Sequence, residues 1–198
     1  KIQSIPQDDY LMMDNFTLRN LEILHSSNFQ GKSLLDIIDK TSTAMGGRLL
    51  RRRLILPLKS VNEINRRLSL IEFFNKEESL KFEILDLLKG ISDLDRLVGK
   101  LAAEKISPKE LGYLRQSLIN IQKIRELLSS HHDVLAWLEP LNNLEELISY
   151  LQNHLNEELP VNLNKGNVIK SEVSEELDRL RNLQSKGKGF LDEMCQRE

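Results

Sequence analysis

The first residues that could do chemistry are Gly31-Lys32-Ser33, which stand just before a predicted helix. This order of residues ends the phosphate-binding loop of many nucleotide-binding proteins, where backbone N–H groups and the lysine hold phosphate oxygens. The complete loop also needs a glycine five residues before Gly31 and a buried strand leading into it. The sequence has Ser26 at that position and a mostly polar lead-in. We therefore interpret the segment as the start of a helix.

The histidines and the cysteine do not form a metal-binding pattern. His131 and His132 are adjacent, so on a helix their side chains point about 100° apart and cannot bind one metal ion together. His25 and His154 stand alone in the sequence. Cys195 is the only cysteine, which excludes a disulfide framework and a cysteine metal cluster, and suits a reducing compartment.

Paired carboxylates also lack a catalytic arrangement. Asp93 with Asp95, and Glu145 with Glu146, stand where helices are predicted to begin, and acidic residues at helix starts interact favourably with the helix dipole. We therefore expect that this segment is not an enzyme and holds no catalytic residue, cofactor or metal.

Four arginines form the strongest concentration of positive charge: Arg48, Arg51, Arg52 and Arg53, with Lys59, Arg66 and Arg67 following. The whole chain has 28 basic and 30 acidic residues, a net charge of −2, so any DNA contact must come from such a local patch. Arg48, Arg51 and Arg52 are candidates for contacts with DNA phosphates. Ion pairing with acidic residues of a neighbouring helix or of another domain is the interpretation that we favour over phosphate contact.

The elements that position these residues are predicted to be helical. Hydrophobic residues make up 40% of the 198 residues and aromatic residues only 5%, and the leucine-rich composition favours helix over sheet. Leu18, Leu21 and Ile23 lie among threonine and arginine after a turn-forming Asp14-Asn15, which predicts a short β-hairpin at about 10–24. The expected fold class is thus mainly α, a multi-helical core domain with one small hairpin near the N-terminus.

Helix-start signals divide the region of about 33–158. Ser33 with Asp36, Ser60 with Glu63 and Ser107-Pro108 with Glu110 are typical of capped helix N-termini. The segment after Ser60 places five apolar residues on one helical stripe: Val61, Ile64, Leu68, Ile71 and Phe74. The predicted helices cover 43–56, from 60 onward, about 78–89, about 93–104, 107–129, a short helix at 134–138, and about 143–155.

A loop over 159–172 separates this region from a last predicted helix, 173–198. Its apolar residues recur at alternating spacings of four and three, as in a coiled coil, but Gly187 and Gly189 weaken its middle by about 1 kcal/mol each. We predict that this helix needs a partner helix and pivots at the glycines. Residues 1–10 carry no apolar signal core, and the chain has no apolar stretch of membrane-spanning length. The helical pattern at the C-terminal end, and the absence of a starting methionine, indicate a segment of a longer protein.

Several blocks along the chain resemble the core domain of the MutS DNA mismatch-repair family. Their order and spacing agree with that family over essentially the whole sequence. The blocks are 13–22 (MDNFTLRNLE), 33–52 (SLLDIIDKTSTAMGGRLLRR) followed by Leu56-Pro57-Leu58, 93–97 (DLDRL), 166–169 (GNVI) and 175–181 (EELDRLR).

The resemblance implies a core domain over 1–172 and the start of a lever helix at 173–198 that leads to a DNA-gripping clamp outside this segment. It also implies a parent protein that is a DNA-dependent ATPase with ATP and Mg²⁺ in another domain. That parent would bind mismatched double-stranded DNA, form a homodimer, act with a MutL-type partner, and be cytoplasmic and nucleoid-associated in bacteria. No membrane partner is implied. The core would link DNA binding to the ATPase.

Two departures from the family pattern leave an alternative open. Arg53 stands where the family usually has tryptophan, and residues 170–173 replace a more usual glycine-bearing stretch. The alternative that these departures leave open is a MutS-like paralogue that acts on other DNA structures. A helical scaffold that binds protein partners through its last helix, and an independent DNA-binding module that uses Arg48 to Arg53, are further alternatives.

Overall fold

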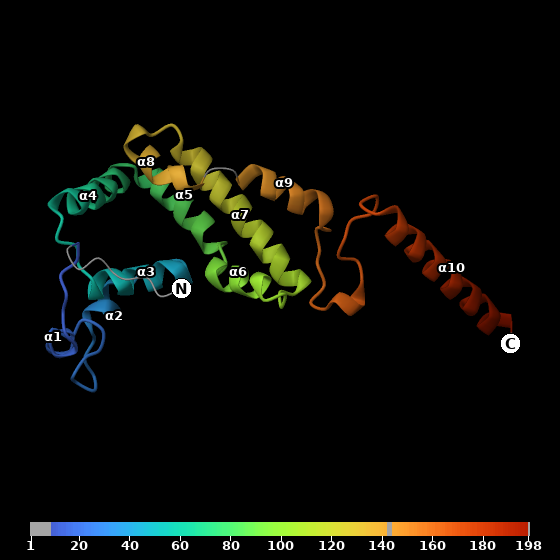
Figure 1. Cartoon of the computed structure of the whole chain (residues 1–198), viewed down its shortest axis with the longest axis horizontal. Helices are drawn as coiled ribbons and strands as arrows, with labels where there is room; N and C mark the ends of the chain where they lie inside the picture. Colours follow the sequence, from blue (N-terminus) through green and yellow to red (C-terminus); the bar gives the residue numbers. More distant parts are fainter. Residues whose placement is uncertain (1–8, 142–143, 198) are drawn as a thin grey trace.

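The computed structural model describes residues 9–141 and 144–197, and its regular elements are helical (Figure 1). Helices α1 to α4 lie at one end, α5 to α9 form the middle, and α10 extends away at the other end. The α-helices are α1 Asn15–Asn20, α2 Leu34–Ile38, α3 Ala44–Ile55, α4 Val61–Lys76, α5 Glu78–Lys89, α6 Leu94–Ala102, α7 Pro108–Leu128, α8 Leu135–Leu138, α9 Leu144–His154 and α10 Glu175–Arg197.

The predicted hairpin at 10–24 is wrong, because a helix forms in its place. The Asp14 side chain accepts a hydrogen bond from the backbone N–H of Thr17 (2.7 Å), and so it caps α1 instead of opening a turn between strands. Leu18 and Leu21 are three residues apart, a spacing that also suits a helix. Among the described residues, the extended contact of this region is a single bridge between Tyr10 and Leu58.

The predicted helix starts are confirmed by the capping bonds. Ser33 and Ser107 each form both bonds of a capping box, with Asp36 and Glu110 respectively. Ser60 caps α4 by accepting from the backbone N–H of Glu63 (3.4 Å), which is one of the two bonds expected there. The mainly helical class and the helix boundaries therefore follow from local chemistry.

Helix α7 is the centre of the packing, and α5, α6 and α9 pack against it. Two apolar clusters lie along it. The first joins α4, α5, α7 and α8 through Phe73, Ile84, Leu128, Val134 and Leu138. The second joins α6, α7 and α9 through Leu97, Leu114, Leu118 and Ile148. The 21 residues of α7 extend over roughly 30 Å, which is enough to contact both clusters.

Polar side chains of α7 fix the turn between α5 and α6. Ser117, which is fully buried, accepts a hydrogen bond from the backbone N–H of Ser92 (3.0 Å). Asn120 donates to the carbonyl of Leu87 (3.1 Å). A Cβ atom at Gly90 would lie 2.4 Å from the Asn120 amide nitrogen, so glycine lets the turn approach α7 this closely. These contacts hold α6 in register with α7.

The apolar stripe predicted on α4 forms, but most of it does not face the core. Phe73 is the buried residue of this helix, and Leu70 and Phe74 pack beside it. Most of the predicted stripe is on the exposed face. The pattern thus predicted the helix correctly. Of the stripe, Phe74 packs against the core, beside Phe73 and Leu70, which lie outside the predicted stripe.

A salt bridge joins the end of α6 to the start of α7. Lys100 bonds to the Glu110 carboxylate, which also accepts from the backbone N–H of Ser107 (3.0 Å). The Lys100 hydrogen bond, followed by that of Ser107, lowers the pKa of Glu110 to about 2. Glu110 therefore serves both the helix cap and the contact between helices.

We expect Ser117→Ala to destabilise the protein by about 1 to 3 kcal/mol, because the partly buried backbone N–H of Ser92 loses its hydrogen-bond partner. Ser129→Ala is the matched control, since the Ser129 hydroxyl bonds a carbonyl of its own helix end at an exposed site. Urea unfolding of the two variants measures the difference. Equal losses in both would show that the Ser117 bond does not hold the turn.

The Glu110 contacts predict a dependence of stability on pH. Because its folded pKa of about 2 lies below the ordinary 4.5, the unfolded state binds more protons between these values. The contribution is complete above the ordinary pKa and is lost as the pH falls toward about 2. Thermal unfolding of wild type and Glu110→Gln should therefore differ at neutral pH and converge in acid. A difference that stays constant down to that pH would contradict this assignment.

Candidate functional site

The arginine cluster of α3 is divided by its contacts. Arg48 forms a two-pronged ion pair with Asp93 (2.8 Å for each bond) and a further bond to Asp95 (2.6 Å). The two aspartates begin α6, 45 residues or more along the chain. The Asp93 and Asp95 carboxylates raise the pKa of Arg48, and Arg48 lowers the pKa of Asp93. Arg48 therefore ties α3 to α6, as the ion-pairing interpretation predicts.

The other arginines of the cluster have no such partner among the residues that the structure describes. Arg51 and Arg52 are exposed on α3 and form no ion pair with the described residues. Arg53 lies close to Arg67 of α4, and both guanidiniums also lack an ion pair within 9–141 and 144–197. Partial burial lowers the pKa of Arg53, and the positive charge of Arg67 lowers it further. Arg48 is thus ion-paired, whereas Arg51, Arg52 and Arg53 form no ion pair with the described part of the chain.

A second polar cluster connects the central helices to α10. Arg115 of α7 donates to the carbonyls of Leu155 (3.2 Å), Asn156 (2.9 Å) and Glu157 (3.0 Å). These carbonyls follow the end of α9, where helical partners are no longer available. The guanidinium therefore fixes the direction in which the chain leaves α9.

Asn156 continues this connection. Its side-chain amide donates to the Asn167 backbone carbonyl and side-chain oxygen (3.0 Å each) and to the Ile169 carbonyl (3.1 Å). Its backbone N–H donates to the carbonyl of Val168 (3.0 Å), which is buried. The predicted loop at 159–172 is therefore held to the end of α9 by a short extended pairing that includes the bridge between Leu155 and Ile169.

Arg181 and Asp178 attach α10 to the same loop. Arg181 donates to the carbonyl of Ile169 (2.8 Å) and pairs with Asp178 (3.0 Å). Asp178 accepts from the backbone N–H of Glu172 (2.6 Å). We call Arg115, Asn156, Asp178 and Arg181 the α10 joint. It is a continuous polar connection from α7 to the base of α10.

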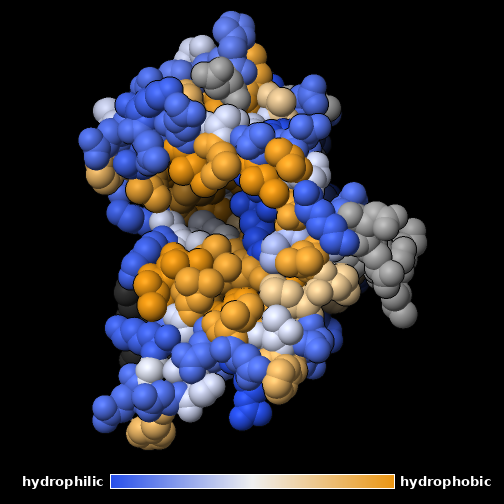
Figure 2. All heavy atoms as spheres, turned by 90° about the vertical axis from the view of Figure 1, so that its left-hand side faces the viewer, coloured by the Kyte–Doolittle hydropathy of each residue, from blue (hydrophilic) through white to orange (hydrophobic). Residues whose placement is uncertain are grey.

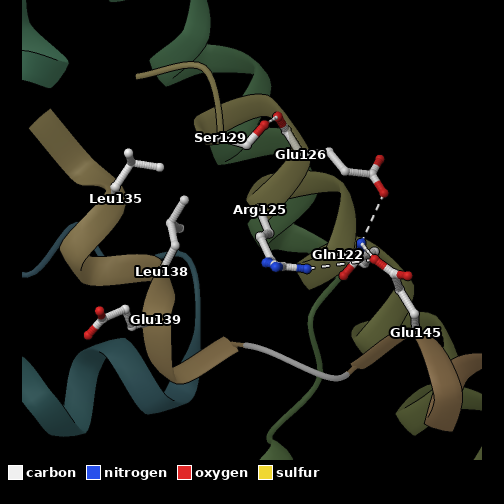
Figure 3. A pocket seen from close by; sticks show the side chains of 8 residues that line it. All are labelled: Gln122, Arg125, Glu126, Ser129, Leu135, Leu138, Glu139 and Glu145. Atoms are coloured by element: carbon white, nitrogen blue, oxygen red, sulfur yellow. Dashed lines mark hydrogen bonds and ion pairs between the residues drawn. The ribbon is translucent and has the colours of Figure 1, made fainter. Parts of the chain in front are cut away.

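A surface pocket of about 470 Å³ opens between α7, α8 and α9 (Figure 3). The polar side chains that line the pocket form hydrogen bonds and an ion pair with one another. Gln122 donates to Glu126 and Glu145 (3.1 Å each), and Arg125 pairs with Glu145 (3.7 Å). The arrangement joins α7 to the start of α9, and it brings no nucleophile next to a base. The lining residues are Gln122, Arg125, Glu126, Ser129, Leu135, Leu138, Glu139 and Glu145.

The remaining motifs have structural roles in the described part of the chain. Ser33 caps α2, and its N–H and hydroxyl both bond Asp36 (3.0 and 2.7 Å). The rings of His131 and His154 contact Phe73 and Tyr150. Within 9–141 and 144–197, no group of three or more histidine, cysteine or acidic side chains could hold a metal ion, and no helix is long and apolar enough to cross a membrane.

Comparison with known families gives the chain its assignment. The family model described as MutS domain III matches residues 16–197. The chain belongs to the MutS domain III family. The sequence is 42% identical over 199 residues to the DNA mismatch repair protein MutS of Christiangramia forsetii and 43% identical to that of Flavobacterium johnsoniae. It is 38% identical to that of Bacteroides thetaiotaomicron over 98% of the chain.

The match to the first two relatives covers all of this chain and 23% of their own length. The blocks that carried the MutS resemblance meet in the structure. Block 33–52 supplies Arg48, and block 93–97 supplies the two aspartates that bind it. Block 166–169 supplies the Ile169 carbonyl that Arg181 of block 175–181 binds. The motifs of this MutS domain III therefore mark its interhelical contacts.

Sequence reasoning missed Arg115 and Asn156. Both lie inside or at the end of helical patterns, where arginine and asparagine are ordinary surface residues. Their partners are backbone carbonyls, which every residue has, so no complementary residue type in the sequence could have indicated them. The one available signal was that Asn156 lies close in sequence to the predicted loop at 159–172, where a side-chain amide can bond to loop carbonyls.

We expect Arg48→Gln to loosen α1 to α3 from the helices of the middle region, because α3 loses its ion pairs with α6. The measurement is limited proteolysis of the segment at 56–60 that joins α3 to α4, which should be cut faster. Arg51→Gln removes the same charge from the same helix without breaking an ion pair to described residues, so its cutting rate should match wild type. Equal cutting of the two variants would disprove the anchoring role.

Proposed function

We propose that this chain is the core of a DNA mismatch-repair protein and relays the state of bound DNA to a distant ATPase. The observation that carries the proposal is the α10 joint, because it connects a long projecting helix to the central packing of α7 through specific polar bonds. The membership of the MutS domain III family supports it. The printed name of the relatives, DNA mismatch repair protein MutS, supports the general role.

The geometry suits mechanical coupling. Coupling between distant sites needs an element with two arrangements that both sites can bias. Helix α10 has 23 residues, a length of roughly 35 Å, and is continuous through Gly187 and Gly189. A Cβ at Gly187 would meet no atom within 4 Å, so packing does not require this glycine. We propose that α10 is the lever, that the α10 joint is its pivot at the base, and that the glycines allow bending along it.

The longer protein would supply the remaining parts. ATP and Mg²⁺ would bind in a domain outside these residues, and this segment would act on them only through the relay. The parent would bind mismatched double-stranded DNA, form a homodimer and act with a MutL-type partner. Of the predicted phosphate contacts, Arg51 and Arg52 present exposed guanidiniums for DNA, while Arg48 contributes only through the half of its side chain that its ion pairs leave exposed.

The α10 joint gives a direct test in the full-length protein. Asn156→Asp keeps the shape of the side chain but replaces the amide donor, so the carbonyls of Asn167 and Ile169 lose their hydrogen bonds. We expect mismatched-DNA affinity without nucleotide to stay close to wild type and ATP-triggered release from that DNA to slow severalfold, because the lever is no longer held at its base. Stopped-flow fluorescence of labelled DNA measures both quantities.

Asn153→Asp is the matched control. It introduces the same charge one turn earlier on α9, at an exposed position without a role in the joint. It should leave both quantities unchanged. If Asn156→Asp releases DNA at the rate of the Asn153→Asp control, the α10 joint is not part of the relay. If neither Asn156→Asp nor the Asn153→Asp control binds mismatched DNA in preference to matched DNA, the mismatch function itself is refuted.

A further inference from the structure

The exposed side of α4 is more apolar than a solvent-facing helix requires. Val61, Ile64, Leu68 and Ile71 recur at spacings of three and four, and they are 66%, 36%, 55% and 57% exposed. We call these four residues the α4 outer stripe. The opposite side of the helix already holds Phe73 in the core, so α4 has two apolar sides and only one is buried. A row of large apolar side chains of this kind indicates an interaction surface.

The neighbouring helices extend this character. Leu49 of α3 and Leu34, Ile37 and Ile38 of α2 are each at least 40% exposed. Figure 2 looks onto the end of the molecule where α1 to α4 lie, and hydrophobic side chains gather there on both sides of a hollow. The surface is therefore shaped to receive an element between its apolar areas.

Two cations accompany the apolar residues. Arg67 lies three residues after Ile64 and four before Ile71, so it flanks the α4 outer stripe. Arg53 lies four residues after the exposed Leu49 on α3. Arg53 and Arg67 are near enough to repel each other, and neither meets a carboxylate of the described residues. The surface thus has a local positive charge with which no carboxylate of 9–141 or 144–197 forms an ion pair.

This combination favours a protein partner over DNA. DNA phosphates bind clusters of exposed cations. Large apolar side chains in such a contact would face the charged sugar-phosphate backbone of the DNA and find no apolar partner there. Protein interfaces combine an apolar centre with arginine and are otherwise depleted of charge. The matching surface needs apolar side chains at helical spacing and at least one carboxylate.

We propose that the α4 outer stripe, with Arg53 and Arg67, docks an acidic amphipathic helix that belongs to the same full-length polypeptide outside these 198 residues. Such residues exist in the relatives, because this chain spans 23% of their length. A second copy of the α4 outer stripe is a poor partner, since it would bring Arg53 and Arg67 against the same two arginines. The acidic residues beside the stripe, Glu63 and Glu72, already pair with Arg66 (3.7 Å) and Lys76 (2.8 Å).

Photo-crosslinking in the full-length protein tests this proposal, which does not depend on the mismatch function. Leu68→p-benzoylphenylalanine places the reactive group on the stripe, and Ser69→p-benzoylphenylalanine places it on the next residue, which points away from the stripe. Irradiation should cross-link position 68, but not 69, to a peptide of the same polypeptide that lies outside these 198 residues and contains aspartate or glutamate; a cross-link to a peptide within them would overturn the proposal. Mass spectrometry identifies the peptide, and the gel mobility separates cross-links within one polypeptide from those between two.

Charge reversal tests the role of the arginines. Arg53→Glu with Arg67→Glu should abolish the cross-link at position 68, whereas Arg51→Glu with Arg52→Glu, which reverses two charges on the same face of the molecule without touching this pair, should preserve it. Circular dichroism confirms that both proteins remain helical. The proposal is overturned if position 68 cross-links to DNA, to a second copy or to nothing, or if reversal of Arg53 and Arg67 leaves the yield unchanged.

Discussion

The rest of the structure depends on the burial of helix α7 on several sides at once. One helix of 21 residues presents Leu114 and Leu118 to α6 and α9, and Leu128 to the cluster around Phe73. Because α5, α6 and α9 all pack on it, their positions relative to one another are set by the register of its side chains. Fully buried Ser117 makes that register specific, since its hydroxyl matches only one position of the α5–α6 turn. A shift of α7 by one residue would separate these groups and leave buried polar atoms unpaired.

Charged and amide side chains connect α3 and α10 to this centre, in addition to the apolar contacts of α4. Arg48 ties α3 to α6, and Arg115, Asn156 and Arg181 tie α10 to α7 and α9. Apolar packing is non-directional, but a hydrogen bond is lost over a small change in distance or angle. Such connections suit segments that must hold one orientation and still be able to leave it. The same contacts explain why several residues of the family motifs lie at helix junctions, next to buried residues of the same motifs such as Leu97 and Val168.

The helices were predictable from local signals in the sequence. The contacts between helices were not, because they join residues that are far apart in the chain. Ser107-Pro108 with Glu110 defines a helix start by bonds within four residues, so the prediction of α7 was correct. Asp14 was misread because an aspartate oxygen serves a turn and a helix cap equally well, and only the following Thr17 N–H decides between them. Ion pairing of Arg48 was predicted because the arginine cluster stands in a chain that has about as many acidic as basic residues. The partners themselves lie 45 residues or more along the chain, and no local pattern identifies them. Arg115 binds backbone carbonyls, which carry no sequence signal at all.

The two apolar sides of α4 show a further limit of periodicity. A helix packed on one side has one apolar stripe, and the stripe of Val61, Ile64, Leu68 and Ile71 satisfies that pattern while facing solvent. The side that contacts the core contains Leu70, Phe73 and Phe74, a shorter run that is less conspicuous in the sequence. A second layer on the exposed side, as proposed above, would bury the stripe that this segment leaves open to solvent. That layer then has to bring the negative charge that Arg53 and Arg67 lack, because two adjacent guanidiniums become favourable in a closed interface only when a carboxylate joins them.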